Sequence, residues 1–83
     1  MERVILVVQA GWVLYAERDP ATPENVVNAA VITRWGTVKG LAELALNGPT
    51  PQTVLSERFS GHVPAASVLF TLNVNPNAKW PSP

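Results

Sequence analysis

One segment of the chain combines residue types that bind a phosphate-bearing ligand. It reads Arg34-Trp35-Gly36-Thr37-Val38-Lys39-Gly40-Leu41 and leads into a stretch whose apolar residues have helical spacing. The start of a helix presents unpaired amides and a partial positive charge, which favours an anion. The two basic side chains could neutralise phosphate, the indole could stack on a base, and the glycines would let a ligand approach the backbone. The predicted ligand-binding residues are Arg34, Trp35, Thr37, Lys39 and Gly40.

The same segment also has a purely structural interpretation. Trp35 could anchor the core, with Arg34 and Lys39 simply solvated. The glycine spacing does not form the phosphate-binding loop G-x-x-x-x-G-K-[ST]. Both interpretations stay open from the sequence.

The sequence predicts neither catalysis nor a metal site. Cysteine is absent and His62 is the single histidine, which excludes thiolate ligands and a histidine pair. No serine lies in a G-x-S-x-G elbow, and the six acidic residues are scattered, so we expect them on the solvated surface. We therefore predict a protein that is not an enzyme and needs no cofactor. A small nucleotide hydrolase is the least favoured function.

Composition narrows the class of partner. The chain has 83 residues, of which 47% are hydrophobic and only 14% charged, with a net charge of zero. A domain of this size has a thin stability margin, and without disulfides or a metal self-association is the usual supplement. We therefore expect a homo-oligomer. A neutral balance argues against binding to nucleic acid and to an anionic membrane surface.

The start of the chain predicts a cytoplasmic protein. The apolar run Val4–Val8 is too short and too rich in β-branched residues for a signal peptide, and charged residues follow at 17–19. No apolar run reaches the ~20 residues that a membrane helix needs.

Apolar patterning predicts mostly strands. Strands are expected at 3–9, 12–17, 26–35, 53–55, 58–63 and 66–74. The first two should form a hairpin, with a bulge at Gly11 as the alternative, and Ser60–Gly61 is a possible turn. The last strand should bury one face, made of the residues Ala66, Val68, Phe70, Leu72 and Val74.

One short helix interrupts the strands. Over Gly36–Asn47 the apolar residues change from alternating to helical spacing. Thr37 can serve as the N-cap of this helix, and Asn47–Gly48 can end it. We expect a helix of about two turns. Residues 1–74 should form a single β-rich domain and 75–83 an extended tail, whose Trp80 should dock on an apolar surface. The predicted fold is mainly β, a small antiparallel barrel or roll of five to six strands with one short helix.

The stretch from Ile32 to Ala45, continuing through Asn47-Gly48-Pro49-Thr50, resembles a group of small proteins encoded by bacteriophages and prophages. The resemblance also includes Thr53-Val54-Leu55, Pro64 and Trp80, and covers about the C-terminal two-thirds of the chain. It implies a phage protein acting in a bacterial host. The group itself brings no known activity. Small phage proteins that self-assemble often act against host immunity, and some counter-defence proteins take up nucleotide signals in pockets of a homo-oligomer.

Two function hypotheses of different classes follow. The first is a non-enzymatic, homo-oligomeric phage protein that binds and sequesters a nucleotide-like small molecule through the segment 34–40. The second is a protein-interaction or assembly factor, acting on a host protein or in the virion, that uses an apolar sheet face or the tail and binds no small molecule.

Overall fold

The computed structural model describes residues 1–81 and contains six strands and one α-helix. In chain order the elements are β1 (Glu2–Val8), β2 (Trp12–Arg18), β3 (Asn25–Arg34), α1 (Leu41–Asn47), β4 (Val54–Leu55), β5 (Phe59–His62) and β6 (Val68–Asn73). Single turns of 3-10 helix lie at Gln9–Gly11 and Ala65–Ser67. The mainly β prediction is confirmed, and so is the single helix.

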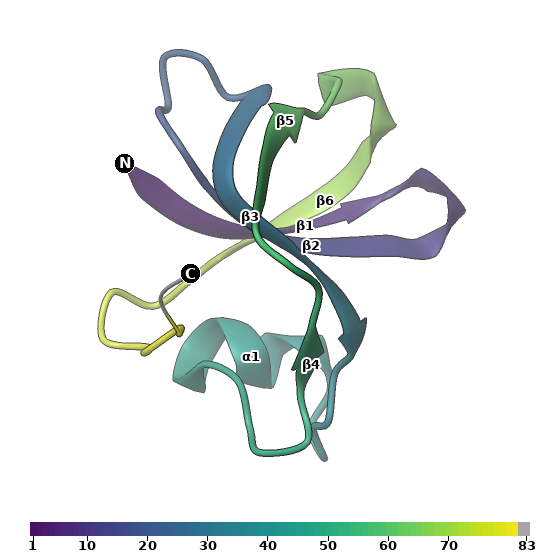
Figure 1. Cartoon of the computed structure of the whole chain (residues 1–83), viewed down its shortest axis with the longest axis vertical. Helices are drawn as coiled ribbons and strands as arrows, with labels where there is room; N and C mark the ends of the chain where they lie inside the picture. The colour runs from purple at the N-terminus through teal and green to yellow at the C-terminus, as the bar shows by residue number, and fades with distance from the viewer. Residues whose placement is uncertain (82–83) are drawn as a thin grey trace.

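All six strands belong to one antiparallel sheet with the order β4-β3-β2-β1-β6, and β5 pairs with β3 beside β4. Strands β1 and β2 form the predicted hairpin, with Val8 opposite Trp12. The turn uses positive φ angles at Ala10 and Gly11. Because β6 pairs only with β1 and β5 only with β3, the sheet curls without closing into a barrel (Figure 1).

The long strand β3 connects the two halves of the sheet. Its outer edge pairs first with β5, at Asn25 to Ala29, and then with β4, at Ile32 and Arg34. Between the two paired stretches, the Ser56 hydroxyl accepts a hydrogen bond from the Val31 amide at 2.8 Å. Both faces of β3 are covered, as the absence of a polar face in its sequence predicted.

Two apolar clusters, one on each side of the sheet, form the core. The first packs α1 and the end of the chain against the sheet, and its buried members are Ile5, Val13, Tyr15, Ile32, Leu41, Leu44, Ala45, Val74 and Ala78. The second lies inside the curl, and its buried members are Val4, Leu6, Val8, Leu14, Ala16, Val26 and Ala29. Because successive side chains of a strand point to opposite faces, β1 contributes apolar residues to both clusters.

The helix is the predicted length but begins later than its predicted cap. It has seven residues, and Gly40, not Thr37, is the N-cap. The Thr37 hydroxyl instead donates to the Gly40 carbonyl at 2.9 Å. Gly48 ends the helix with φ of 83° and donates its amide to Leu44, as the Asn-Gly stop predicted.

Two predictions about the last strands are wrong. Ser60–Gly61 lies inside β5 and makes no turn. The expected buried face of β6 is broken because its pairing with β1 shifts register between Val7 and Val8, which separates Val68 from Phe70. As an edge strand β6 also leaves Leu69 62% and Phe70 54% exposed.

Residues 74–81, which follow β6, pack against the domain; residues 82–83 of the predicted tail lie outside the described residues. Arg3 donates to the carbonyls of Asn75, Pro76 and Ala78, and the Asn75 amide donates to Ala45 of the helix. The Trp80 ring stacks on Tyr15 with centroids 4.4 Å apart, which confirms that this tryptophan docks.

Candidate functional site

The segment from Arg34 to Gly40 has a backbone fixed by hydroxyl groups. Thr53 donates to the Trp35 carbonyl and Thr50 to the Gly36 carbonyl, each at 2.7 Å. Gly36 has φ of 66°, and a Cβ there would lie 2.4 Å from the Gln52 carbonyl carbon. The 50–53 turn therefore fits directly against Gly36, and no larger residue leaves room for this contact. The side chains of the segment are carried on a fixed frame.

Some of the polar groups at the start of the helix already have hydrogen-bond partners. The Lys39 amide donates to the Glu43 carboxylate at 3.2 Å, where an anionic ligand would otherwise sit. The Thr37 hydroxyl is bonded to Gly40. Thr37 and Gly40 are thus bonded to each other within the segment. The groups left to contact a ligand include the side chains of Arg34, Trp35 and Lys39.

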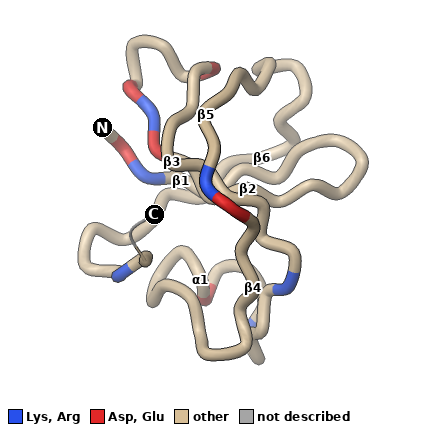
Figure 2. The backbone as a smooth tube through the Cα atoms, viewed as in Figure 1, with Lys and Arg blue, Asp and Glu red and all other residues tan. Residues whose placement is uncertain are grey.

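Those three side chains point into solvent. Arg34 and Lys39 are exposed, and Trp35 is 42% exposed, so the tryptophan is not a buried core anchor. Within residues 1–81, neither basic side chain has a hydrogen-bond or ion-pair partner. Figure 2 shows that the basic and acidic residues are scattered along the backbone.

Other arginines of the chain are structural. Arg3 holds the carbonyls that follow β6. Arg18 pairs with Glu2 at 2.6 Å. Arg58 donates to the carbonyls of Asn28 and Pro81 and lies over the Tyr15 ring. Of the arginines, Arg34 alone has no such role in the described part of the chain.

The structure also reveals a cavity that the sequence did not predict. It has a volume of about 340 Å³ and lies between β6 and the residues that join β5 to β6. Its apolar wall includes Leu6, Val63 and Val68, and its polar rim includes Arg18 and Glu24. These residues come from distant strands and loops, so no local sequence signal identifies them.

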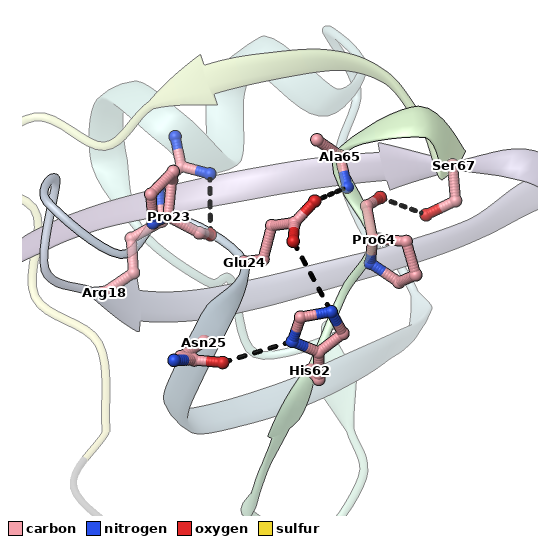
Figure 3. Close-up of polar contacts among 8 residues, drawn as sticks. All are labelled: Arg18, Pro23, Glu24, Asn25, His62, Pro64, Ala65 and Ser67. Carbon is pink, nitrogen blue, oxygen red and sulfur yellow. Dashed lines mark hydrogen bonds and ion pairs between the residues drawn. The ribbon is translucent and has the colours of Figure 1, made fainter.

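Glu24 joins the start of β3 to the β5–β6 connection beside this cavity (Figure 3). Its carboxylate accepts from the Ala65 amide and approaches the Nε2 atom of His62 at 3.5 Å, while its carbonyl accepts from the Val63 amide. The Nδ1 atom of His62 lies 3.1 Å from the Asn25 side-chain oxygen. A neutral imidazole can donate to only one of these acceptors. His62 thus lies at the surface, where it contacts Asn25 across the β3–β5 pairing and Glu24 just before β3.

No group of three His, Asp or Glu side chains within residues 1–81 converges on a point that could hold a metal ion. Over the same residues, no helix has the length and apolar character to cross a membrane. No protein-family model, no curated protein and no solved structure matches the chain.

Proposed function

We propose that this chain is a non-enzymatic, homo-oligomeric protein that binds a phosphate-bearing small molecule, such as a nucleotide, through Arg34, Trp35 and Lys39. One observation carries the proposal. Arg34 and Lys39, which have no hydrogen-bond or ion-pair partner within residues 1–81, lie one and four residues from the exposed indole of Trp35 in the sequence, on a segment whose backbone is fixed at Trp35 and Gly36. A guanidinium, an ammonium and an aromatic face together match a phosphate joined to a base.

A fixed backbone favours binding because less entropy is lost when the ligand arrives. The segment is exposed and none of its residues lines the cavity beside Glu24. Small-molecule sites normally bury most of the ligand. A second copy of the chain would supply the missing wall, which links the proposed ligand to the proposed oligomer.

The resemblance to small phage proteins supports one physiological role. In the cytoplasm of an infected bacterium, an oligomer that holds a nucleotide signal without converting it would keep that signal from the host's immune effectors. A phage protein of this kind acts by stoichiometric sequestration, so it needs affinity and abundance and no catalytic group.

Titration calorimetry with a nucleotide panel, including ATP and a cyclic dinucleotide, tests the proposal. We expect one member to bind, and Arg34→Ala to weaken its affinity at least about tenfold, since a charge-assisted hydrogen bond contributes about 1.5–3 kcal/mol. Lys79→Ala is the matched control, because it removes an exposed cation outside the segment. Equal affinity in folded Arg34→Ala protein would refute this site. The ligand should also be recovered chemically intact.

A second function, a protein-interaction or assembly factor, is favoured by a different observation. Trp12, Leu69 and Phe70 expose 56%, 62% and 54% of their surfaces at the end of the sheet where the hairpin turn and β6 lie. Exposed apolar groups of this size often mark a protein-binding surface. This function predicts that Leu69→Lys abolishes partner or self-association and that no nucleotide binds.

A further inference from the structure

Strand β6 ends the sheet, and one of its edges has no partner strand. Within residues 1–81 it pairs with β1 alone (Figure 1). The Val74 amide, just after β6, donates to the Arg3 carbonyl of β1 at 3.1 Å. In an antiparallel pair, successive residues alternate between bonding the neighbouring strand and pointing away from it. The main-chain groups of Leu72 therefore point toward β1, and those of Thr71 and Asn73 point away from it.

The space beside this edge is open. Thr71 and Asn73 are exposed. Thr71 also lines the cavity of about 340 Å³ that lies between β6 and the residues joining β5 to β6. An unpaired edge is a template for a further strand, because a second extended backbone supplies the hydrogen-bond partners that its amides and carbonyls lack.

The residues of β6 lack the charges and prolines that keep a second strand off the edge of many sheets. Residues 63–78 contain no ionisable side chain, and the nearest prolines, Pro64 and Pro76, lie outside the strand. Leu69 and Phe70 instead expose 62% and 54% of their surfaces. The register shift against β1 lies before Phe70, so the stretch 71–73 is regularly paired on its other side. The strand is therefore suited to pairing along its free edge.

We propose that β6 pairs through this edge with β6 of a second copy of this chain, antiparallel, so that the two sheets become continuous. Two identical antiparallel strands are related by a two-fold axis, and residue i then meets j while j meets i. Thr71 and Asn73 of each copy supply amides and carbonyls for the new ladder. Because residues 63–78 are uncharged, these segments of the two copies approach each other without electrostatic repulsion.

The composition favours a second copy as the occupant over another protein. The chain has 83 residues and no cysteine. A domain of this size has a thin stability margin, for which self-association is a usual supplement. Continuing the sheet adds main-chain hydrogen bonds and covers the exposed parts of Leu69 and Phe70 in one contact.

This inference rests on the proposed function only for its homo-oligomeric state. Strand β6 contains none of the ligand residues, and β1 and β2 lie between it and β3, the strand that ends at Arg34, in the sheet order. The contact through β6 and the binding of a ligand are therefore tested by separate measurements.

Sedimentation equilibrium of the full chain without ligand tests the contact. We expect a dimer or larger oligomer for the wild type and half of the wild-type mass for Thr71→Pro. Proline removes the outward amide and is tolerated on an edge strand where that amide faces solvent, so the fold should persist. Thr71→Val is the matched control, since it keeps the amide and a β-branched side chain, and its mass should equal that of the wild type.

Circular dichroism checks that Thr71→Pro is folded. Where it is not, Thr71→Lys takes its place in the test, because a lysine on the edge opposes pairing and leaves the main chain intact. The expected result is again half of the wild-type mass.

Hydrogen exchange of the unmodified chain tests the same contact at single amides. At a concentration where the chain is assembled, the Thr71 and Asn73 amides should exchange at least about tenfold more slowly than free amides. This protection should be lost on dilution. The Leu72 amide is the internal control, because it points toward β1 and should be protected at every concentration.

A monomeric wild type overturns the proposed contact. So does an assembly whose mass is unchanged in the folded Thr71 variants, or one whose Thr71 and Asn73 amides exchange freely.

Calorimetry of the wild type with the nucleotide panel separates this contact from the proposed ligand. If no nucleotide binds but Thr71→Pro halves the assembly, the contact through β6 stands and the proposed ligand fails. If a nucleotide binds and Thr71→Pro leaves the mass unchanged, the contact fails and the proposed ligand stands.

Discussion

Gly36 determines how closely the segment 34–40 and the 50–53 turn approach each other. Its φ of 66° and its contact with the 50–53 turn each exclude a side chain. The threonine hydroxyls that fix the neighbouring carbonyls depend on the same approach. A single residue without a Cβ thus positions Arg34 and Trp35.

Gly36→Ala should destabilise the fold by about 2–5 kcal/mol. The positive φ costs a non-glycine residue about 1–2 kcal/mol, and forcing a methyl into the occupied space adds about 1–3 kcal/mol. Gly11→Ala is the control, because Gly11 has φ of 83° with open space around its Cβ position, so only the conformational cost applies. Urea unfolding measures both. Equal losses in the two variants would show that the contact with the 50–53 turn is not tight.

Tyr15 has its pKa raised above the ordinary value of 10.0. Burial of the phenol is the main cause, and the hydrogen bond it donates to Glu17, with that carboxylate's charge, adds to it, while Arg3 acts in the opposite direction. A raised pKa in the folded state means that folding favours the protonated phenol. The resulting stability is fully present below the unfolded pKa of about 10 and is lost as the pH rises through the folded value.

Titration of the tyrosinate absorbance should therefore show a midpoint above 10, and Tyr15 is the only tyrosine in the chain. The free energy of unfolding should fall between neutral pH and the alkaline range. Tyr15→Phe should remove the contribution of this group to that fall. A midpoint at or below the ordinary value would contradict the burial of the hydroxyl.

At the scale of elements, the segment after β6 behaves as part of the core. Val74 and Ala78 are buried in the cluster beneath the helix, and Trp80 covers Tyr15. The composition of this segment, with three prolines and two asparagines, indicated only an extended chain. Extended backbone is compatible with tight packing where carbonyls are bonded by a side chain such as Arg3.

Trp80→Ala should cost about 3 kcal/mol, the lower end for a buried aromatic, since the ring is only partly covered. Trp80→Phe keeps an aromatic ring on Tyr15 and should cost less than half as much. Thermal and urea unfolding of both variants provide the measurement. A loss below about 1 kcal/mol in Trp80→Ala would mean that the stack contributes little and that the segment frays in solution.

At the scale of the whole molecule, the contacts of Glu24 extend the pairing of β3 with β5 into the connection that leads to β6. Glu24 bonds the start of β3 to the connection between β5 and β6. The cavity of about 340 Å³ lies just inside this contact. These contacts therefore hold the connection to β6 against the start of β3.

Glu24→Ala should remove protection from hydrogen exchange at the Ala65 amide, about tenfold or more, which corresponds to about 1.4 kcal/mol. The Val63 amide should lose less, because it donates to the main-chain carbonyl of residue 24, which the substitution keeps. Glu24→Gln retains an acceptor and should preserve most of the protection. Unchanged exchange at Ala65 in Glu24→Ala would show that the contact is absent in solution.

Local pattern was enough to predict most of the elements. Alternating and β-branched residues predicted β1, β2 and β3 to within two residues at each end. The Asn47-Gly48 pair predicted the end of the helix. These features depend on residues close together in the chain, where side-chain period and backbone preference act directly. The sequence also singled out Arg34, Trp35 and Lys39, whose side chains are exposed, and their binding of a ligand stays a prediction.

Only the tertiary structure decided features that depend on distant residues. The carbonyls of Trp35 and Gly36 are bound by the hydroxyls of Thr53 and Thr50, which lie in a turn distant in sequence. The expected buried face of β6 failed because β6 lies at an edge and shifts its register against β1. Strand order, register and the cavity beside Glu24 arise from contacts between residues far apart in sequence. A one-residue shift in register turns side chains to the other face, and no local pattern fixes that choice.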